Sequence, residues 1–303
     1  MRITGLAYFA ALVAWVAACR PAGSETLRVG KHTRTYELFV PTDTPNLPLV
    51  IALHGRGSTG RQMERFTHFD DVAAREQFVV VYPDAIDHHW NDSRAGMNTG
   101  VDDVGFIAAL IDEMAATHHI DRHRVYITGM SNGAMMSYTL ACELSDRITA
   151  IAPVAGDLPA VPCRPARPIS VLAINGTADP LVPYAGGTAG KGGQVLSAEA
   201  STDTFAALAG CRAPTTALEP DTSPGDGTRT RSRHYACPSP LDVELLTIEN
   251  GGHTWPGAAQ YLPKLLIGPT SRDFNASDRI WAFFADRDGF QLRELDRRSV
   301  GNR

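Results

Sequence analysis

The amino-acid sequence predicts an α/β fold, with a mostly parallel, doubly wound sheet, helices on both of its faces and an antiparallel edge at the N-terminus. Two observations lead to this prediction. Short, nearly continuous apolar runs are typical of strands buried on both faces, and between them lie segments with apolar residues three and four positions apart. Alternation of strand and helix is typical of parallel sheets, because each crossover needs a helix to return the chain.

The strands follow from two patterns. Segments 26–29 and 34–40 alternate polar and apolar residues around a turn at 30–33, which predicts an antiparallel hairpin at the edge of the sheet. The buried strands are predicted at 47–53, 78–82, 125–128, 148–154, 169–174 and 243–248.

The helices are predicted at 62–76, 104–117, 134–144, 198–209 and 277–285. Asp102 and Asp103 directly precede one of them, and carboxylates at this place favour the positive end of a helix, so we interpret the pair as a cap. Segments 184–193 and 214–231 are rich in Gly, Pro, Ser and Thr and are predicted to be irregular.

Length and composition predict one exported domain. The 303 residues are 44% hydrophobic and 20% charged, which suits a single domain over 26–285, followed by a charged tail at 286–303. The net charge of -5 and the lack of a dense basic run exclude a nucleic-acid-binding protein. The sequence leaves the oligomeric state open.

The N-terminus predicts a signal peptide at 1–19. Arg2 precedes an apolar run over 3–18, which is shorter than the roughly 18 to 20 residues that cross a bilayer. Val16-Ala17-Ala18-Cys19 resembles a bacterial lipobox, in which an acylated Cys19 would be the only membrane anchor. The alternative is ordinary cleavage after Ala18 or Ala22, with no lipid attached.

The remaining cysteines are an even number in a chain expected to enter an oxidising compartment, so two disulfides are predicted. Four cysteines allow three pairings. We favour Cys142 with Cys163 and Cys211 with Cys237, because each pair closes a short loop. No spacing typical of a metal site occurs, and we expect neither a metal nor an organic cofactor.

Gly129-Met130-Ser131-Asn132-Gly133 stands where a predicted strand gives way to a predicted helix. This pattern is typical of a nucleophile elbow, in which a serine projects from a turn so tight that side chains two positions either side would collide. Ser131 is therefore the candidate nucleophile. The alternative is a glycine-rich turn with an incidental serine.

A serine nucleophile needs a base, and the base needs an acid that orients it. Asp179 follows the 169–174 strand and His253 follows the 243–248 strand, so both are expected at the carboxyl edge of the sheet. The order Ser131, Asp179, His253 is that of an α/β-hydrolase. Asp157, after the 148–154 strand, is the reserve acid.

The negative oxygen that forms during acyl transfer needs hydrogen-bond donors. We expect one from the backbone N–H of Asn132, which follows the nucleophile, and one from the loop after the 47–53 strand. In that loop Arg56 is the first candidate and Gly57 the second.

Several motifs occur in order over residues 47–284: His54-Gly55, Tyr82-Pro83-Asp84, Trp90, Val101-Asp102-Asp103-Val104-Gly105-Phe106, Arg124-Val125-Tyr126, the elbow, Gly176-Thr177-Ala178-Asp179 and Gly252-His253-Thr254-Trp255-Pro256-Gly257. With them the chain resembles secreted polyhydroxybutyrate depolymerases and feruloyl esterases. The resemblance implies a serine esterase with Ser131, Asp179 and His253 as its triad, and paired cysteines. The chain departs from its relatives in carrying Arg56, where they often have a smaller residue or cysteine, and in showing no added polymer-binding module.

The expected activity is hydrolysis of small or oligomeric carboxylic esters. Trp90 and Trp255 are candidates for an aromatic wall that binds a flat acyl group or a sugar, unless they pack the core instead. We favour feruloyl-type esters of plant polysaccharide, with hydroxyalkanoate oligomers as the alternative. A non-catalytic ligand-binding protein of the same fold and a peptidase remain as rivals.

Overall fold

The computed structural model describes residues 20–96, 100–190 and 192–287. The predicted signal peptide at 1–19 with Cys19, and all but the first two residues of the predicted tail, lie outside the described residues. Within the described part, no helix is both long and apolar enough to span a bilayer.

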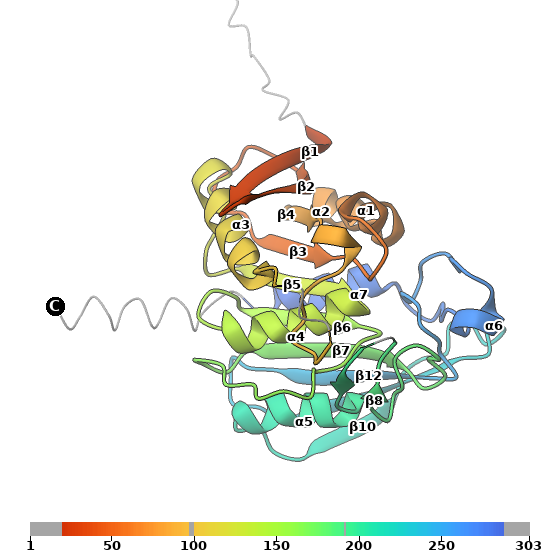
Figure 1. Cartoon of the computed structure of the whole chain (residues 1–303). Helices are drawn as coiled ribbons and strands as arrows, with labels where there is room; N and C mark the ends of the chain where they lie inside the picture. Colours follow the sequence, from red (N-terminus) through yellow and green to blue (C-terminus); the bar gives the residue numbers. More distant parts are fainter. Residues whose placement is uncertain (1–19, 97–99, 191, 288–303) are drawn as a thin grey trace, which may run out of the picture.

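A ten-stranded mixed sheet forms the centre of the molecule (Figure 1). Its order is β1-β2-β4-β3-β5-β6-β7-β12-β11-β10, and the six strands from β4 to β12 in that order are parallel. The bounds are β1 Arg20–Val29, β2 His32–Val40, β3 Leu49–Leu53, β4 Val79–Pro83, β5 Val125–Met130, β6 Ala150–Val154, β7 Ser170–Gly176, β10 Pro214–Leu218, β11 Arg229–Tyr235 and β12 Val243–Glu249.

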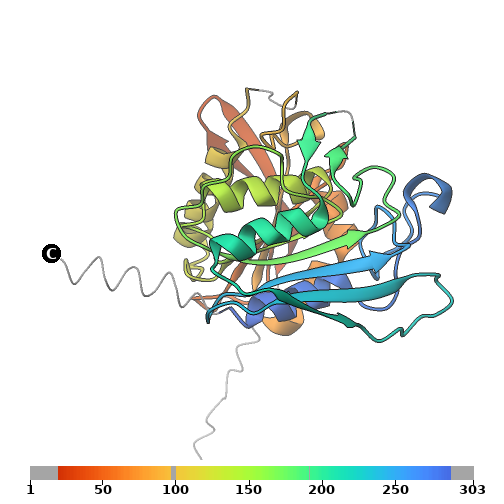
Figure 2. The same cartoon turned by 90° about the horizontal axis from the view of Figure 1, so that it is seen from below.

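Helices cover both faces of the sheet (Figure 2). One apolar core lies under α3 (Asp103–Thr117), α4 (Asn132–Glu143) and α5 (Ala198–Leu208). A second core lies on the other face under α1 (Gly60–Thr67), α2 (Phe69–Glu76) and α7 (Ala276–Ala285). The central strands are buried on both faces, as their apolar runs predict. The predicted α/β-hydrolase architecture is confirmed.

Short elements lie around this frame. They are η1 (Ile86–His88), the hairpin of β8 (Gly187–Thr188) and β9 (Gln194–Val195), and α6 (Lys264–Ile267), which projects from the body of the molecule (Figure 1).

The sequence predictions fail in three places. The helix expected at 62–76 is two helices, because His68 adopts a left-handed conformation with φ 53° and ends the first one. The segment 214–231, expected to be irregular, contains β10 and the start of β11, which extend the sheet by an antiparallel hairpin. The strands leave no apolar run in the sequence, because the buried side chains of β11 are the hydroxylated Thr230, Ser232 and Tyr235. The segment 184–193 likewise contains β8.

Two disulfides close the loops that the sequence favoured. Cys142 at the end of α4 is bonded to Cys163, and Cys211 after α5 is bonded to Cys237 after β11. Both lie beside the core that α3, α4 and α5 cover. Asp102 caps α3 by accepting a hydrogen bond from the Gly105 N–H, whereas Asp103 instead pairs with buried Arg34 at 2.7 Å.

Candidate active site

Ser131 occupies a strained turn between β5 and α4. Its φ of 59° and ψ of -118° are uncommon for a residue with a side chain, and such conformations cost of order 1–3 kcal/mol. The turn is held by the Ser131 N–H, which donates to Val154 O, and by Ser131 O, which accepts from the Met135 N–H. Strained backbone conformations that the surrounding structure maintains occur mostly at functional sites.

Gly129 and Gly133 make this turn sterically feasible. A Cβ on Gly133 would lie 2.3 Å from Leu53 O and 2.7 Å from His54 O. A Cβ on Gly129 would lie 2.6 Å from Gly133 O and 2.8 Å from Leu53 O. Because these distances are shorter than real Cβ atoms show, the start of α4 can pack against β3 only with glycine at both positions.

Asp179 and His253 meet at the carboxyl edge of the sheet. Asp179 follows β7, His253 follows the adjacent β12, and Asp179 Oδ2 lies 2.7 Å from His253 Nδ1. The other oxygen, Oδ1, accepts the N–H groups of Leu181 and Val182, both at 2.8 Å. Since an ionised carboxylate only accepts hydrogen bonds, Nδ1 of His253 carries the proton and Nε2 is left as the basic atom.

The backbone of His253 is also fixed. Its N–H donates to Ile267 O, and its carbonyl accepts the Tyr261 hydroxyl at 3.0 Å. Both His253 and Asp179 are buried, so their hydrogen bond lies out of bulk solvent.

Asp157, the reserve acid, lies near Asp179 but contacts Asn175 and not His253. It follows β6 and is fully buried, and its Oδ1 accepts from Asn175 Nδ2 at 3.2 Å. Among the described residues its Oδ2 has no hydrogen-bond partner. Burial, and then the nearby charge of Asp179, raise the pKa of Asp157 well above its ordinary value. The carboxylate that contacts His253 is therefore Asp179 and not Asp157.

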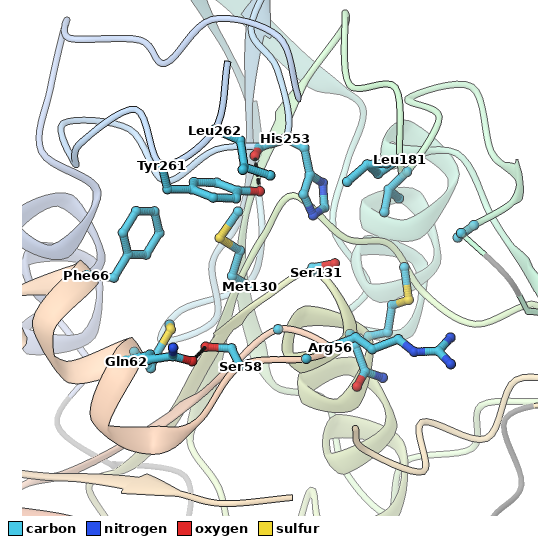
Figure 3. A pocket seen from close by; sticks show the side chains of 18 of the residues that line it. Arg56, Ser58, Gln62, Phe66, Met130, Ser131, Leu181, His253, Tyr261 and Leu262 are labelled. Carbon is cyan, nitrogen blue, oxygen red and sulfur yellow. Dashed lines mark hydrogen bonds between the residues drawn. The ribbon is translucent and has the colours of Figure 1, made fainter. Parts of the chain in front are cut away.

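Ser131 and His253 line one cavity of about 710 Å³. In Figure 3 the imidazole of His253 points toward Ser131, with Phe66, Tyr261 and Leu262 on one side and Leu181 on the other. The Ser131 hydroxyl has no hydrogen-bond partner within the described ranges. Hydrogen bonds between a nucleophile and its base commonly tighten only when substrate is bound.

The predicted oxyanion donors differ in whether their backbone N–H groups already make a hydrogen bond. Asn132 is the first residue of α4, and no acceptor for its backbone N–H is found in the described part of the chain. Such an N–H at a helix start can receive negative charge. Arg56 lines the same cavity. Gly57, the second candidate, already donates its N–H to His88 O at 2.7 Å, so this group is committed.

Buried His54 holds the loop that carries Arg56. Its Nδ1 lies 2.8 Å from Gly55 O and its Nε2 accepts the Ala85 N–H at 3.0 Å, a pattern that requires the neutral ring. Burial lowers the pKa of His54, which favours the same form.

The structure places Trp90 and Trp255 in the core and not on the cavity wall, which is the alternative that the sequence left open. Both side chains are fully buried, neither lines the cavity, and each indole N–H donates to a group inside the core. Trp90 donates to His54 O at 2.9 Å, and Trp255 donates to Ser277 Oγ at 3.1 Å.

The aromatic residues of the cavity are Phe66 and Tyr261, whose rings pack edge to face with centroids 5.5 Å apart. Sequence reasoning missed both. Phe66 lies in a predicted amphipathic helix, where an aromatic residue is ordinarily assigned to the core, and Tyr261 lies in a loop without a motif.

Comparison with known proteins gives consistent results. Residues 34–161 match the family described as "Esterase PHB depolymerase". The chain is 34% identical over 271 residues to a putative esterase, NocK, of Nocardia uniformis subsp. tsuyamanensis, a match that covers 82% of this chain and 78% of the relative. It is 28% identical over 273 residues to a probable feruloyl esterase C of Aspergillus niger, covering 86% and 87%.

Among solved structures, an acetyl xylan esterase from Aspergillus awamori superposes with a TM-score of 0.56 over 77% of this chain and 94% of that one. At 15% identity this likeness concerns the fold alone.

Proposed function

This chain belongs to the PHB depolymerase esterase family and is a carboxylic ester hydrolase, and within that class we propose that it is an exported serine esterase with Ser131, His253 and Asp179 as its triad. The observation that carries the proposal is the 2.7 Å contact between His253 Nδ1 and Asp179 Oδ2, on a ring that points toward Ser131 across a shared cavity. Side chains from three separate strand ends converge there, as acyl transfer by a serine requires.

The mechanism follows from the protonation pattern. Since Nδ1 donates to Asp179, Nε2 of His253 is free to take the Ser131 proton while the oxygen attacks the ester carbonyl. The Asn132 N–H, with the Arg56 N–H as the second donor, stabilises the negative oxygen of the tetrahedral intermediate. His253 then returns the proton to the departing alcohol, and water releases the acid from the acyl-enzyme by the same steps.

Feruloyl-type esters are our preferred substrates. The edge-to-face pair of Phe66 and Tyr261 on the cavity wall supports this choice, because it offers apolar surface beside which a flat ring can pack. The relative named feruloyl esterase C points the same way. Oligomers of hydroxyalkanoates are the second candidate, supported by the family description and by the aliphatic Leu181, Val182 and Leu262 in the cavity.

Export is supported by the two disulfides, which persist in oxidising compartments. A lipid on Cys19 is part of the proposal and would be the means of attachment to a membrane. Mass spectrometry of the mature N-terminus distinguishes an acylated Cys19 from cleavage after Ala18 or Ala22.

Replacing the nucleophile tests the triad. We expect Ser131→Ala to lower kcat for p-nitrophenyl butyrate by about 10⁵- to 10⁶-fold and to abolish labelling by a fluorophosphonate. Ser223→Ala, at a serine that does not line the cavity, is the matched control and should retain both. Turnover by the folded Ser131→Ala variant at the wild-type rate would refute the proposal.

Substrate class is tested by measuring kcat/KM for methyl ferulate, hydroxybutyrate oligomers and acetylated xylan under one condition. We expect methyl ferulate to be preferred. A higher value for the oligomers would select the second candidate, and labelling without turnover of any ester would leave the binding-protein rival.

A further inference from the structure

A buried ion pair lies directly behind Asn132. Asp92 is fully buried, and Arg94, which lines the cavity, is 5% exposed. Arg94 Nη2 donates to Asp92 Oδ2 at 2.7 Å, and Arg94 Nε lies 3.0 Å from both carboxylate oxygens. A guanidinium fork of this kind fixes direction as well as charge.

The carboxylate of this pair reaches the residue after the nucleophile. Asp92 Oδ2 accepts from Asn132 Nδ2 at 2.6 Å, and the same amide donates to Trp90 O at 3.1 Å. Asn132 Oδ1 in turn accepts the Trp90 N–H at 2.7 Å. The side chain of Asn132 is therefore saturated by this segment, and its orientation is fixed at the start of α4.

The guanidinium reaches the opposite way, to the cavity wall. Arg94 Nη1 donates to Ala189 O at 3.1 Å and to Gly192 O at 2.9 Å. Ala189 lines the cavity and packs in a small apolar cluster with Met135 and Val182, which line it too.

We propose that Arg94 is a positioning residue that couples oxyanion stabilisation to the shape of the cavity. Through Asp92 it orients Asn132, and through the Ala189 and Gly192 carbonyls it fixes one wall, so the same guanidinium sets both rate and the bulk of ester accepted. This inference rests on the proposed function, because it gives the Asn132 N–H the role of an oxyanion donor.

Charge gives the coupling its strength. Without Arg94, the carboxylate of Asp92 would be a buried, unpaired negative charge that is hydrogen-bonded to Asn132. Because the Asn132 N–H faces the developing oxyanion, this charge would oppose the reaction. Arg94 neutralises it, and a lysine could supply the charge but not the two parallel hydrogen bonds and the two carbonyl contacts.

Three variants separate charge from tethering: Arg94→Met, Arg94→Lys and the charge-neutral Asp92→Asn/Arg94→Met. Their kcat and KM are measured on p-nitrophenyl acetate and p-nitrophenyl octanoate, per active site counted by fluorophosphonate labelling. We expect Arg94→Met to lower kcat about 100-fold on both esters, the scale of one oxyanion donor. The double variant should regain about tenfold, because it removes the carboxylate charge.

The hydrogen bonds from Arg94 to the Ala189 and Gly192 carbonyls predict a second effect, on KM. In all three variants the ratio of octanoate to acetate KM should shift by about threefold or more, since each loses the Nη1 hydrogen bonds to the Ala189 and Gly192 carbonyls that hold the wall. Arg94→Lys should keep kcat within about tenfold of wild type. If Arg94→Met does not fold, the neutral double variant carries the test.

Glu244→Gln/Arg279→Met is the matched control. It removes an ion pair of 2.8 Å that joins β12 to α7, away from the cavity, and should leave both parameters unchanged per labelled site. An Arg94→Met variant with wild-type kcat, or any of the three Arg94 variants with an unchanged KM ratio, would overturn the inference. A wild-type enzyme that the fluorophosphonate does not label would instead overturn the proposed function.

Discussion

The floor and the walls of the cavity are built in opposite ways. The floor consists of the Gly129–Gly133 turn with Asp179 and His253, which stand at strand ends and are fixed by hydrogen bonds and close backbone packing. The walls, from α1, from 181–190 and from 261–262, present mainly apolar side chains carried on a helix surface and on loops. One region tolerates almost no change of shape, whereas the other can change side chains without altering the sheet.

This difference separates chemistry from selectivity. The floor requires particular atoms at particular places, because proton transfer needs aligned donors and acceptors. The walls require only volume and apolar surface, whose contribution changes gradually with each group removed. Floor variants should therefore lower kcat for every ester, and wall variants should redistribute KM among esters.

The largest effect that tests the floor comes from Asp179, with the nearby carboxylate of Asp157 as the comparison. Asp179→Asn should lower kcat by about 10⁴-fold, because an amide favours the wrong tautomer of His253. Asp157→Asn should stay within a few-fold of wild type, since Asp157 does not contact the imidazole. The measurement is kcat on p-nitrophenyl butyrate for both variants, and the reverse order of effects would make Asp157 the triad acid.

Adding one methyl group to the turn should disrupt the floor through a steric clash, with no change in charge or hydrogen bonding. Gly133→Ala places a Cβ 2.3 Å from Leu53 O, so α4 must move and carry Ser131 with it. A shift of about 1 Å costs roughly 100-fold in rate, so we expect at least that loss in kcat, with a lower melting temperature.

Gly225→Ala is the matched control for this variant. No atom lies within 4 Å of a Cβ at Gly225, and activity should be retained there. A Gly133→Ala enzyme of wild-type activity would show that the floor is as adaptable as the walls.

Asp157, which lies near the floor residue Asp179, can be tested through stability. Burial raises its pKa in the folded protein above the ordinary 3.8, so the folded state binds the proton more tightly than the unfolded state does. As pH rises through the window between these two pKa values, the wild type loses about 1.4 kcal/mol of unfolding free energy per pH unit. Asp157→Asn, which is neutral at every pH, should escape that loss.

Denaturant unfolding at several pH values measures this difference. The variant should gain on the wild type from about pH 4 upward, and the gap should be constant below it. A gap that does not change with pH would mean that Asp157 is ionised in the folded protein.

The placement of the floor residues could be predicted from the sequence, and that of the wall residues could not. The sequence places Ser131, Asp179 and His253 at one edge of the sheet, because each follows a predicted strand by a few residues and strand ends of a parallel sheet meet at one edge. The position of the sheet follows from runs such as 125–130, because such continuous apolar segments are stable only as strands that are buried on both faces.

The failures share a physical cause. Trp90 and Trp255 belong to the motifs, but their indole N–H groups find partners in the core, and the sequence does not show where a side chain of that size points. Phe66 lines the cavity from the last turn of α1, and neither a glycine nor a proline marks the end of this helix at His68. Contacts between distant loops, such as Arg94 with Ala189, leave no local pattern at all.

The smallest expected effect concerns Tyr261, which belongs to both regions. Its ring is part of the wall, while its hydroxyl donates to the carbonyl of His253 on the floor. Tyr261→Phe keeps the ring and should leave the KM for methyl ferulate unchanged while lowering kcat about fivefold, the worth of one hydrogen bond near 1 kcal/mol.

Phe66→Leu makes the complementary change on the same wall. It removes an aromatic face and keeps apolar bulk, so it should raise the KM for methyl ferulate about fivefold and leave kcat for p-nitrophenyl butyrate unchanged. Because the two residues pack on each other, steady-state kinetics of both single variants and of the double variant decide how separate the regions are. Independent effects on kcat and KM in the double variant support the division, and a Phe66→Leu enzyme that loses kcat on both esters contradicts it.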